Sequence, residues 1–107
     1  MAGDVSGNWS GTVIAKTPDG DSNQETAYMS LKQAGNAVTG TAGANAGQQS
    51  AIKDGKVDGD QVEFKVSVGE ATANVRLRMD GDRMKGEAVI DTPDGKVTAS
   101  LDLKRVQ

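Results

Sequence analysis

The stretch VEFKVSVGEATANVRLRM, residues 62–79, decides the fold, because apolar and polar side chains alternate through it almost without a break. Strict alternation is typical of β-strands that turn one face to a core and the other to water. Gly69 and Glu70 interrupt the pattern for two residues, the length of a tight hairpin connection. The stretch therefore predicts two antiparallel strands, 61–68 and 71–79, that share one buried face.

Turn signals divide the rest of the 107-residue chain in the same way. The tetrapeptide Thr-Pro-Asp-Gly occurs at 17–20 and again at 92–95, Asp-Gly-Asp occurs at 58–60 and 80–82, and Gly35 precedes Asn36. Proline, glycine and aspartate favour the backbone conformations that turns require. Because every connection is short, each strand is expected to pair antiparallel with the next. The predicted strands are 8–16, 25–34, 37–43, 50–57, 61–68, 71–79, 83–91 and 96–105.

A sheet of eight up-and-down strands leaves two edges exposed unless the last strand pairs with the first, and closure removes both edges. The predicted fold class is therefore all-β, an eight-stranded antiparallel meander barrel formed by a single domain, residues 1–107, with residues 1–6 expected to be disordered. A flattened two-layer sandwich of the same strands is the alternative.

An internal repeat supports the hairpin assignment. Residues 31–42 align without gaps on residues 77–88, each segment having an apolar anchor, a glycine turn, a second apolar anchor and then an inward glycine. Shared hairpin geometry and duplication both explain the repeat.

Because consecutive strands run in opposite directions, alternate connections lie at the same end of the barrel, and this predicts which residues lie at each end. The turns at 35–36, 58–60 and 80–82 share one end with both termini, and the connections at 17–24, 44–49, 69–70 and 92–95 share the other. Large inward side chains gather near the termini: Trp9, Leu31, Val38, Val57, Val62, Leu77, Met79, Met84, Leu101 and Leu103.

Smaller inward side chains gather at the opposite end, and two interpretations stay open. An eight-stranded barrel has room for packed side chains or for one small ligand. The first interpretation is a cavity for a small apolar molecule. The second is a dry interior in which the opposite walls of the sheet pack closely against each other. The predicted cavity lining is Val13, Ala15, Ala27, Met29, Ala42, Val68, Ala71, Ala73, Ala88 and Ile90.

The composition excludes several classes of function. The chain has no cysteine and no histidine, so it lacks thiolate ligands, the commonest metal ligand and the usual general base near neutral pH. A net charge of −3, scattered cations and 3% aromatic residues argue against nucleic-acid binding. Apolar runs are too short for membrane insertion.

Catalytic constellations are also missing from the sequence. The Asp-Gly-Asp pairs superficially suit Ca²⁺ but lack the further oxygens and closing Glu of an EF-hand, so they are interpreted as turns. Glu63, Glu87 and Asp102 fall on outward faces, and no Ser or Thr has a histidine partner. We therefore expect no enzyme, no cofactor, and no catalytic or metal-ligating residues.

Gly7-Asn8-Trp9 opens the first strand, and Arg105 closes the last. This pattern resembles the Gly-x-Trp signature of calycins, which include lipocalins, avidins and fatty-acid-binding proteins. The resemblance implies a lipocalin- or streptavidin-like barrel whose base is plugged by Trp9, with Arg105 crossing the indole. The lipocalin second-loop Arg motif and the polar biotin shell of avidins are absent, so neither ligand class carries over.

The chain is also similar to an uncharacterised β-module of secreted or envelope proteins of soil bacteria, which is sometimes fused to amidohydrolase-type enzymes. The similarity covers nearly all of the chain through G-x-W-x-G, L-x-x-x-G-x-x-V-x-G-x-A, G-K-V-D-G-D-x-V-x-F and the closing L-x-L-x-R. It implies no activity. The similarity favours a periplasmic or secreted location. Because no signal peptide is visible, this location implies that the leader has been removed; a cytoplasmic location is the alternative.

Two functions from different classes remain open. The first is a small-molecule binding module with the cavity at the alanine-rich end. The second is an interaction or accessory domain, without a ligand cavity, that contacts a protein partner or its own copy. Ile14 and Val89 are the few outward apolar residues, so the sequence indicates no broad apolar patch.

Overall fold

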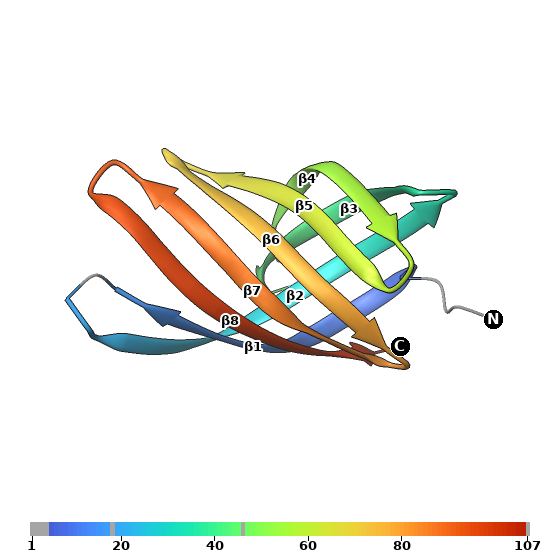
Figure 1. Ribbon diagram of the computed structural model, residues 1–107, viewed down its shortest axis with the longest axis horizontal. Coiled ribbons are helices and arrows are strands. Elements are labelled where there is room, and N and C mark those ends of the chain that lie inside the picture. The colour runs from blue at the N-terminus through green and yellow to red at the C-terminus, as the bar shows by residue number, and fades with distance from the viewer. Residues whose placement is uncertain (1–4, 18, 46, 107) are drawn as a thin grey trace.

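The structure is a computed structural model that describes residues 5–17, 19–45 and 47–106. Each strand pairs antiparallel with the next, and β1 pairs with β8, so the eight strands form a closed barrel (Figure 1). The predicted fold class is confirmed and the sandwich alternative is wrong. The strands are β1 Gly7–Lys16, β2 Ser22–Ala34, β3 Ala37–Asn45, β4 Gln48–Asp58, β5 Gln61–Val68, β6 Ala71–Asp80, β7 Arg83–Thr92 and β8 Gly95–Val106.

Two strands begin at least two residues earlier than the sequence predicts. β2 starts at Ser22 rather than at residue 25, and β4 starts at Gln48 rather than at residue 50. Ser22 to Gln24 lack apolar alternation, but they pair with Lys16 to Ile14 of β1, so the ladder extends the strand beyond the hydrophobic pattern. The connections expected at 17–24 and 44–49 are therefore shorter, at 17–21 and 46–47.

The two ends of the barrel differ in their connections. The turns after β2, β4 and β6 lie at the end that holds both termini, which we call the base, and the other connections lie at the opposite end, the mouth (Figure 1). Gly35, Gly59 and Gly81 each open a base turn with φ of +62°. The residue after each of these glycines accepts a backbone hydrogen bond from another strand, as in Met79 N–H to Asp60 O at 2.7 Å. These bonds join each base turn to the rest of the barrel.

Inward glycines allow the strands to curve into a small barrel. Gly11, Gly40 and Gly86 face the interior, and a Cβ on any of them would strike a backbone carbonyl oxygen of a neighbouring strand. Each glycine is paired with a leucine on that strand, namely Leu103, Leu31 and Leu77 respectively. The strands approach each other at these points more closely than side chains permit.

Trp9 and Arg105 close the base of the barrel. The Trp9 side chain is fully buried, and the guanidinium carbon of Arg105 lies 4.4 Å from the centre of its ring. This is a cation–π geometry, since a cation within about 6 Å of the ring centroid is attracted by its negative face. Arg105 Nε also donates to Asp82 Oδ1 at 3.1 Å, which links the plug to the turn after β6.

Val5 and Ser6 belong to the segment expected to be disordered, yet both are packed into the base. Val5 is fully buried, and its carbonyl accepts a hydrogen bond from Trp9 Nε1 at 2.9 Å. The carbonyl of Ser6 accepts a hydrogen bond from Arg105 Nη1, and its hydroxyl accepts one from Gln33 N at 2.8 Å. The chain before β1 thus contributes to the core; residues 1–4 lie outside the described part.

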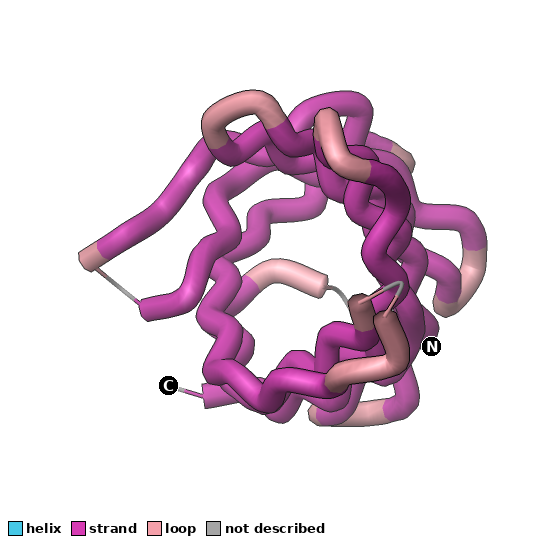
Figure 2. Tube along the Cα trace, turned by 90° about the vertical axis from the view of Figure 1, so that its left-hand side faces the viewer, coloured by secondary structure: helices cyan, strands magenta, loops and turns pink. Residues whose placement is uncertain are grey.

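The core is apolar, because none of the described residues that are buried is polar or charged. Its side chains come from every strand, and the strands form a ring around the barrel axis (Figure 2).

Candidate functional site

The residues predicted to line a cavity fall into two groups by their burial, and Met29 of the buried group lies directly opposite Trp9 of the base. Ala27, Met29, Ala42 and Ala88 are buried, with exposed fractions of 3–6%. The others that the structure describes are half-buried and closer to the opening: Val13, Ala15, Ala71, Ala73 and Ile90. The side chain of Val68 lies outside the described residues.

The base half contrasts with the mouth half. All ten large side chains expected near the termini are buried, with exposed fractions of 7% or less. Burial therefore falls from the base to the mouth, where the half-buried side chains include Ala15, Ala71 and Ala73 as well as Val13 and Ile90. The inner wall at the mouth is apolar and partly open to solvent, which is the chemistry of a pocket that accepts an apolar group.

The sequence interpretation missed part of this inner wall. Ile52 and Val97 are half-buried, and they pair with Val66 and Ile90, which lie on the inner face. Ile52 was missed because β4 contains a bulge, where Asp54 has a φ of +53° and the pairing with β5 shifts between Lys53 and Lys56. A bulge adds one residue and reverses the alternation beyond it. The dipeptide Asp54-Gly55 is the sequence signal that could have revealed the bulge.

The wall of the mouth is lower on the side of β3 and β4. Among the described residue pairs, β2 pairs with β3 only from Tyr28 onward, and β5 pairs with β4 only as far as Val66. The first residues of β2 and the last residues of β5 therefore extend beyond the shorter hairpin between them. The opening is wider on this side than between the long hairpins.

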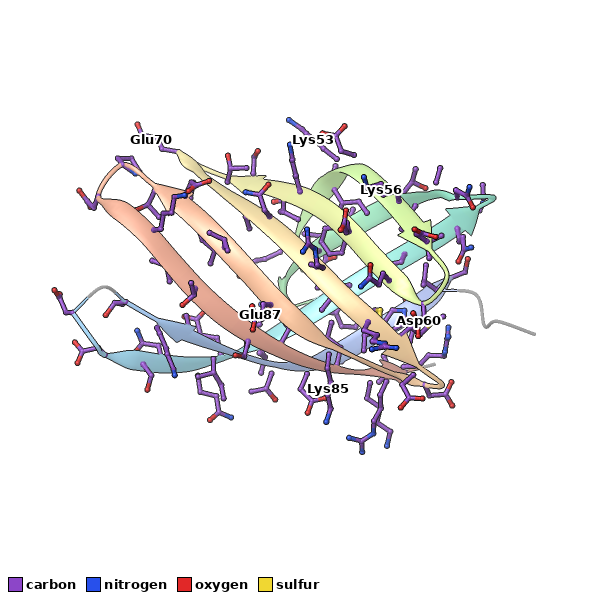
Figure 3. All side chains as sticks on the ribbon, in the orientation of Figure 1. Lys53, Lys56, Asp60, Glu70, Lys85 and Glu87 are labelled. Atoms are coloured by element: carbon purple, nitrogen blue, oxygen red, sulfur yellow. The ribbon has the colours of Figure 1, made fainter. Side chains whose placement is uncertain are left out.

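The rim of the mouth is acidic. We define the rim as the described residues of connections 17–21, 46–47, 69–70 and 93–94, with two residues on each side. It carries five carboxylates, Asp19, Asp21, Glu70, Asp91 and Asp94, against Lys16 and Lys96. Glu70 marks the mouth end of β5 and β6 in Figure 3. Lys96 is already engaged, with its Nζ 3.9 Å from Asp91 Oδ1.

Glu25 adds a carboxylate on the inner side of the mouth. It pairs with Val13 and lies two residues before the buried Ala27, so it shares their face of β2. The side chain is exposed. The sequence interpretation missed Glu25 because it began the strand there. A ligand that enters the mouth therefore meets negative charge before it reaches apolar side chains.

The remaining carboxylates show no arrangement for metal binding. Within the described residues, no group of three or more His, Cys, Asp or Glu side chains could hold a metal ion. Two acids of the Asp-Gly-Asp turns are ion-paired: Asp60 with Arg78 at 3.2 Å and Asp82 with Arg105 at 3.1 Å. These aspartates therefore serve as anchors for neighbouring strands. No helix in the described part of the chain is long and apolar enough to cross a membrane.

Comparison with protein families finds no family that matches the chain, and comparison with curated proteins finds no match either.

Proposed function

We propose that this barrel is a calycin-type, non-catalytic binding module that takes a small apolar ligand without negative charge through its mouth. The observation that carries the proposal is the change along the inner wall, from large side chains that are buried at the base to half-buried side chains at the mouth, three of which are the alanines Ala15, Ala71 and Ala73. Small side chains at one end leave space that larger side chains would otherwise fill in a barrel of eight strands.

Calycin kinship is supported by the base rather than by the mouth. Trp9 lies at the start of β1, and Arg105, near the end of β8, covers its ring at 4.4 Å. This is the arrangement that the Gly-x-Trp resemblance implies, and it leaves the opposite end free for a ligand.

The charge of the mouth narrows the ligand class. Five rim carboxylates and Glu25 surround an apolar wall, and two lysines oppose them. A ligand with its own carboxylate or sulfonate would meet repulsion on entry, whereas a neutral or cationic one would not.

The test is a titration with Nile red, a neutral apolar fluorophore, followed by its emission. Ala73→Phe fills the mouth and is expected to abolish most of the fluorescence increase. Ala51→Phe makes the same chemical change at an exposed position of β4 and is the matched control. Equal Nile red responses from the two variants, both folded by circular dichroism, would overturn the proposal and favour an accessory domain without a ligand cavity.

A second comparison tests the charge argument. The anionic probe 8-anilinonaphthalene-1-sulfonate is expected to bind more weakly than Nile red, and Glu25→Gln is expected to strengthen its binding. If the substitution leaves the binding of the anionic probe unchanged, Glu25 does not face the ligand path.

A further inference from the structure

The outer wall of the barrel carries a hollow that is separate from the mouth. We call it the outer groove: it covers the outer faces of β5, β6 and β7, with β4 beside them, and has a volume of about 600 Å³. Its lining consists mostly of outward residues of these strands, joined by the inward Phe64, Val75, Leu77 and Gly86, and includes none of the residues at the mouth. A second hollow of about 500 Å³ adjoins it at the base and shares Arg78 and Lys85 with it.

The middle of the outer groove is balanced in charge. Glu63 lies between two cations, with Oε2 3.6 Å from Lys56 Nζ and Oε1 3.0 Å from Arg76 Nε. Glu87 lies directly across from Arg76 on β7. Opposite charges in neighbouring positions stabilise a sheet, so this row is explained by the fold alone.

Each end of the groove brings two cations together. Arg78 lies directly opposite Lys85 at the base end, and at the other end Lys65 lies opposite Lys53, which stands beside the groove rather than in its lining (Lys53 and Lys85 are labelled in Figure 3). Like charges in directly opposite positions destabilise a sheet. Acids compensate part of this charge, because Asp102 lies directly opposite Lys85 on β8, Arg78 contacts Asp60 and Lys65 lies 3.9 Å from Asp54. None of the ion pairs among the described residues includes Lys85.

These pairs have no acidic counterpart. Among the described strand pairs, three place two cations opposite each other, the third being Arg83 with Lys104, and none places two acids opposite each other. The chain as a whole has more acids than bases, 15 against 12. The like-charge pairs among the described residues are therefore all cationic, and two of the three involve a residue of the outer groove.

We propose that the outer groove binds an extended, acidic segment of another protein. The two cationic ends would each take a carboxylate, since Arg and Lys form charge-assisted hydrogen bonds with carboxylates. Arg78 lies four residues along β6 from Asn74, the partner of Lys65, so the ends are about 14 Å apart at the usual rise and spacing of strands. An extended peptide covers about this distance in four residues, which gives two acids separated by three other residues.

The charges between the ends favour a peptide over a continuous polyanion. Glu63 and Glu87 lie along the middle of the groove, and Asp60 and Asp102 flank Arg78 and Lys85. A polymer with a negative charge on every unit would meet these acids, whereas a peptide with neutral residues between two carboxylates would not.

The experiment titrates the protein with a fluorescein-labelled peptide of sequence Gly-Glu-Thr-Ser-Thr-Glu-Gly and follows its anisotropy. Lys85→Glu is expected to weaken binding by roughly tenfold or more, because it reverses one end of the groove. Lys32→Glu makes the same charge change on β2, outside the groove, and is expected to bind as the wild type does. Replacing both peptide glutamates by glutamine is expected to abolish binding.

The remaining outcomes overturn the proposal. Equal binding by the two lysine variants would show that only net charge matters. Heparin is the test for a non-specific polyanion surface. Such a surface would bind heparin more tightly than the peptide, and Lys85→Glu and Lys32→Glu would weaken heparin binding equally. A concentration-dependent dimer that Lys85→Glu abolishes would identify a second copy as the occupant. Folding is checked separately by the unfolding midpoint of Lys85→Glu, which is expected to stay close to that of the wild type, because a new attraction to Arg78 is offset by a new repulsion from Asp102.

Discussion

Replacing Gly86 by alanine tests whether the inward glycines are what allow the barrel to close. A Cβ at this position would lie 2.8 Å from the Cα of Leu77 and closer still to the carbonyl oxygen of Arg76. Carbon atoms in contact normally stay about 3.5–4.0 Å apart. Because both obstacles belong to the backbone of β6, no change of rotamer relieves the clash, and β6 and β7 have to separate.

The expected loss of stability follows from three contributions. Forcing extra volume into a close-packed interior costs about 1–3 kcal/mol, and weakening a hydrogen bond between the strands adds about 1 kcal/mol. Alanine also lowers the conformational entropy of the unfolded chain, which stabilises the folded state by about 0.4–1 kcal/mol. The free energy of unfolding should therefore fall by about 1–4 kcal/mol, and each kcal/mol lowers the thermal midpoint of a domain of this size by about 4–8 °C.

Urea titration and thermal melting, both followed by far-ultraviolet circular dichroism, measure the change. Gly47→Ala is the matched control, because its Cβ would meet only the side-chain oxygen of Asn45, at 3.3 Å. The control should stay within about 0.5 kcal/mol of the wild type, as most surface substitutions do. If Gly86→Ala is as stable as Gly47→Ala, the close approach of the strands does not constrain the barrel.

Three further predictions concern the base. Arg105→Lys keeps the charge but loses the planar group over Trp9 and the fork that reaches Asp82, so the free energy of unfolding should fall by about 1–3 kcal/mol; unchanged stability and Trp9 emission would contradict this. Val5→Ala should cost about 1–2 kcal/mol in urea titration, because the side chain is fully buried; no change would mean that the segment before β1 does not pack in solution. Asp60→Asn should cost less than about 1 kcal/mol, since its ion pair is exposed to solvent, and a larger loss in the same titration would contradict that assignment.

The strands and their closure follow from the sequence because local patterns determine them. Alternation in 62–79 marks two strands, and short turns leave each strand only one neighbour to pair with next. The start of β2 could not be predicted, because Ser22 and Asn23 become strand only through pairing with β1. Val5 could not be placed, because its backbone is held by Gln33, which is distant along the chain, as well as by the nearby Trp9.

The candidate sites depend on relations between strands, which alternation alone does not contain. Arg78 and Lys85 become neighbours through the register of β6 and β7, and that register follows from the turn at residues 81–82. The sequence could therefore have predicted the pair, but not the hollow beside it, which depends on how the strands curve. The bulge at Asp54 likewise decides which face Ile52 occupies.

The sharpest joint test of the two proposals combines one variant from each surface. A larger side chain at Ala73 would bury more apolar surface. A glutamate at position 85 would replace a repulsion from Arg78 by an attraction, but it would also replace the attraction of Lys85 to Asp102, directly opposite on β8, by a repulsion. Neither change is therefore expected to cost much stability. If ligand access at the mouth and an acidic partner on the outer wall are separate properties, each variant should fold like the wild type and lose only its own interaction. Loss of both interactions from either variant would indicate a change of the whole fold.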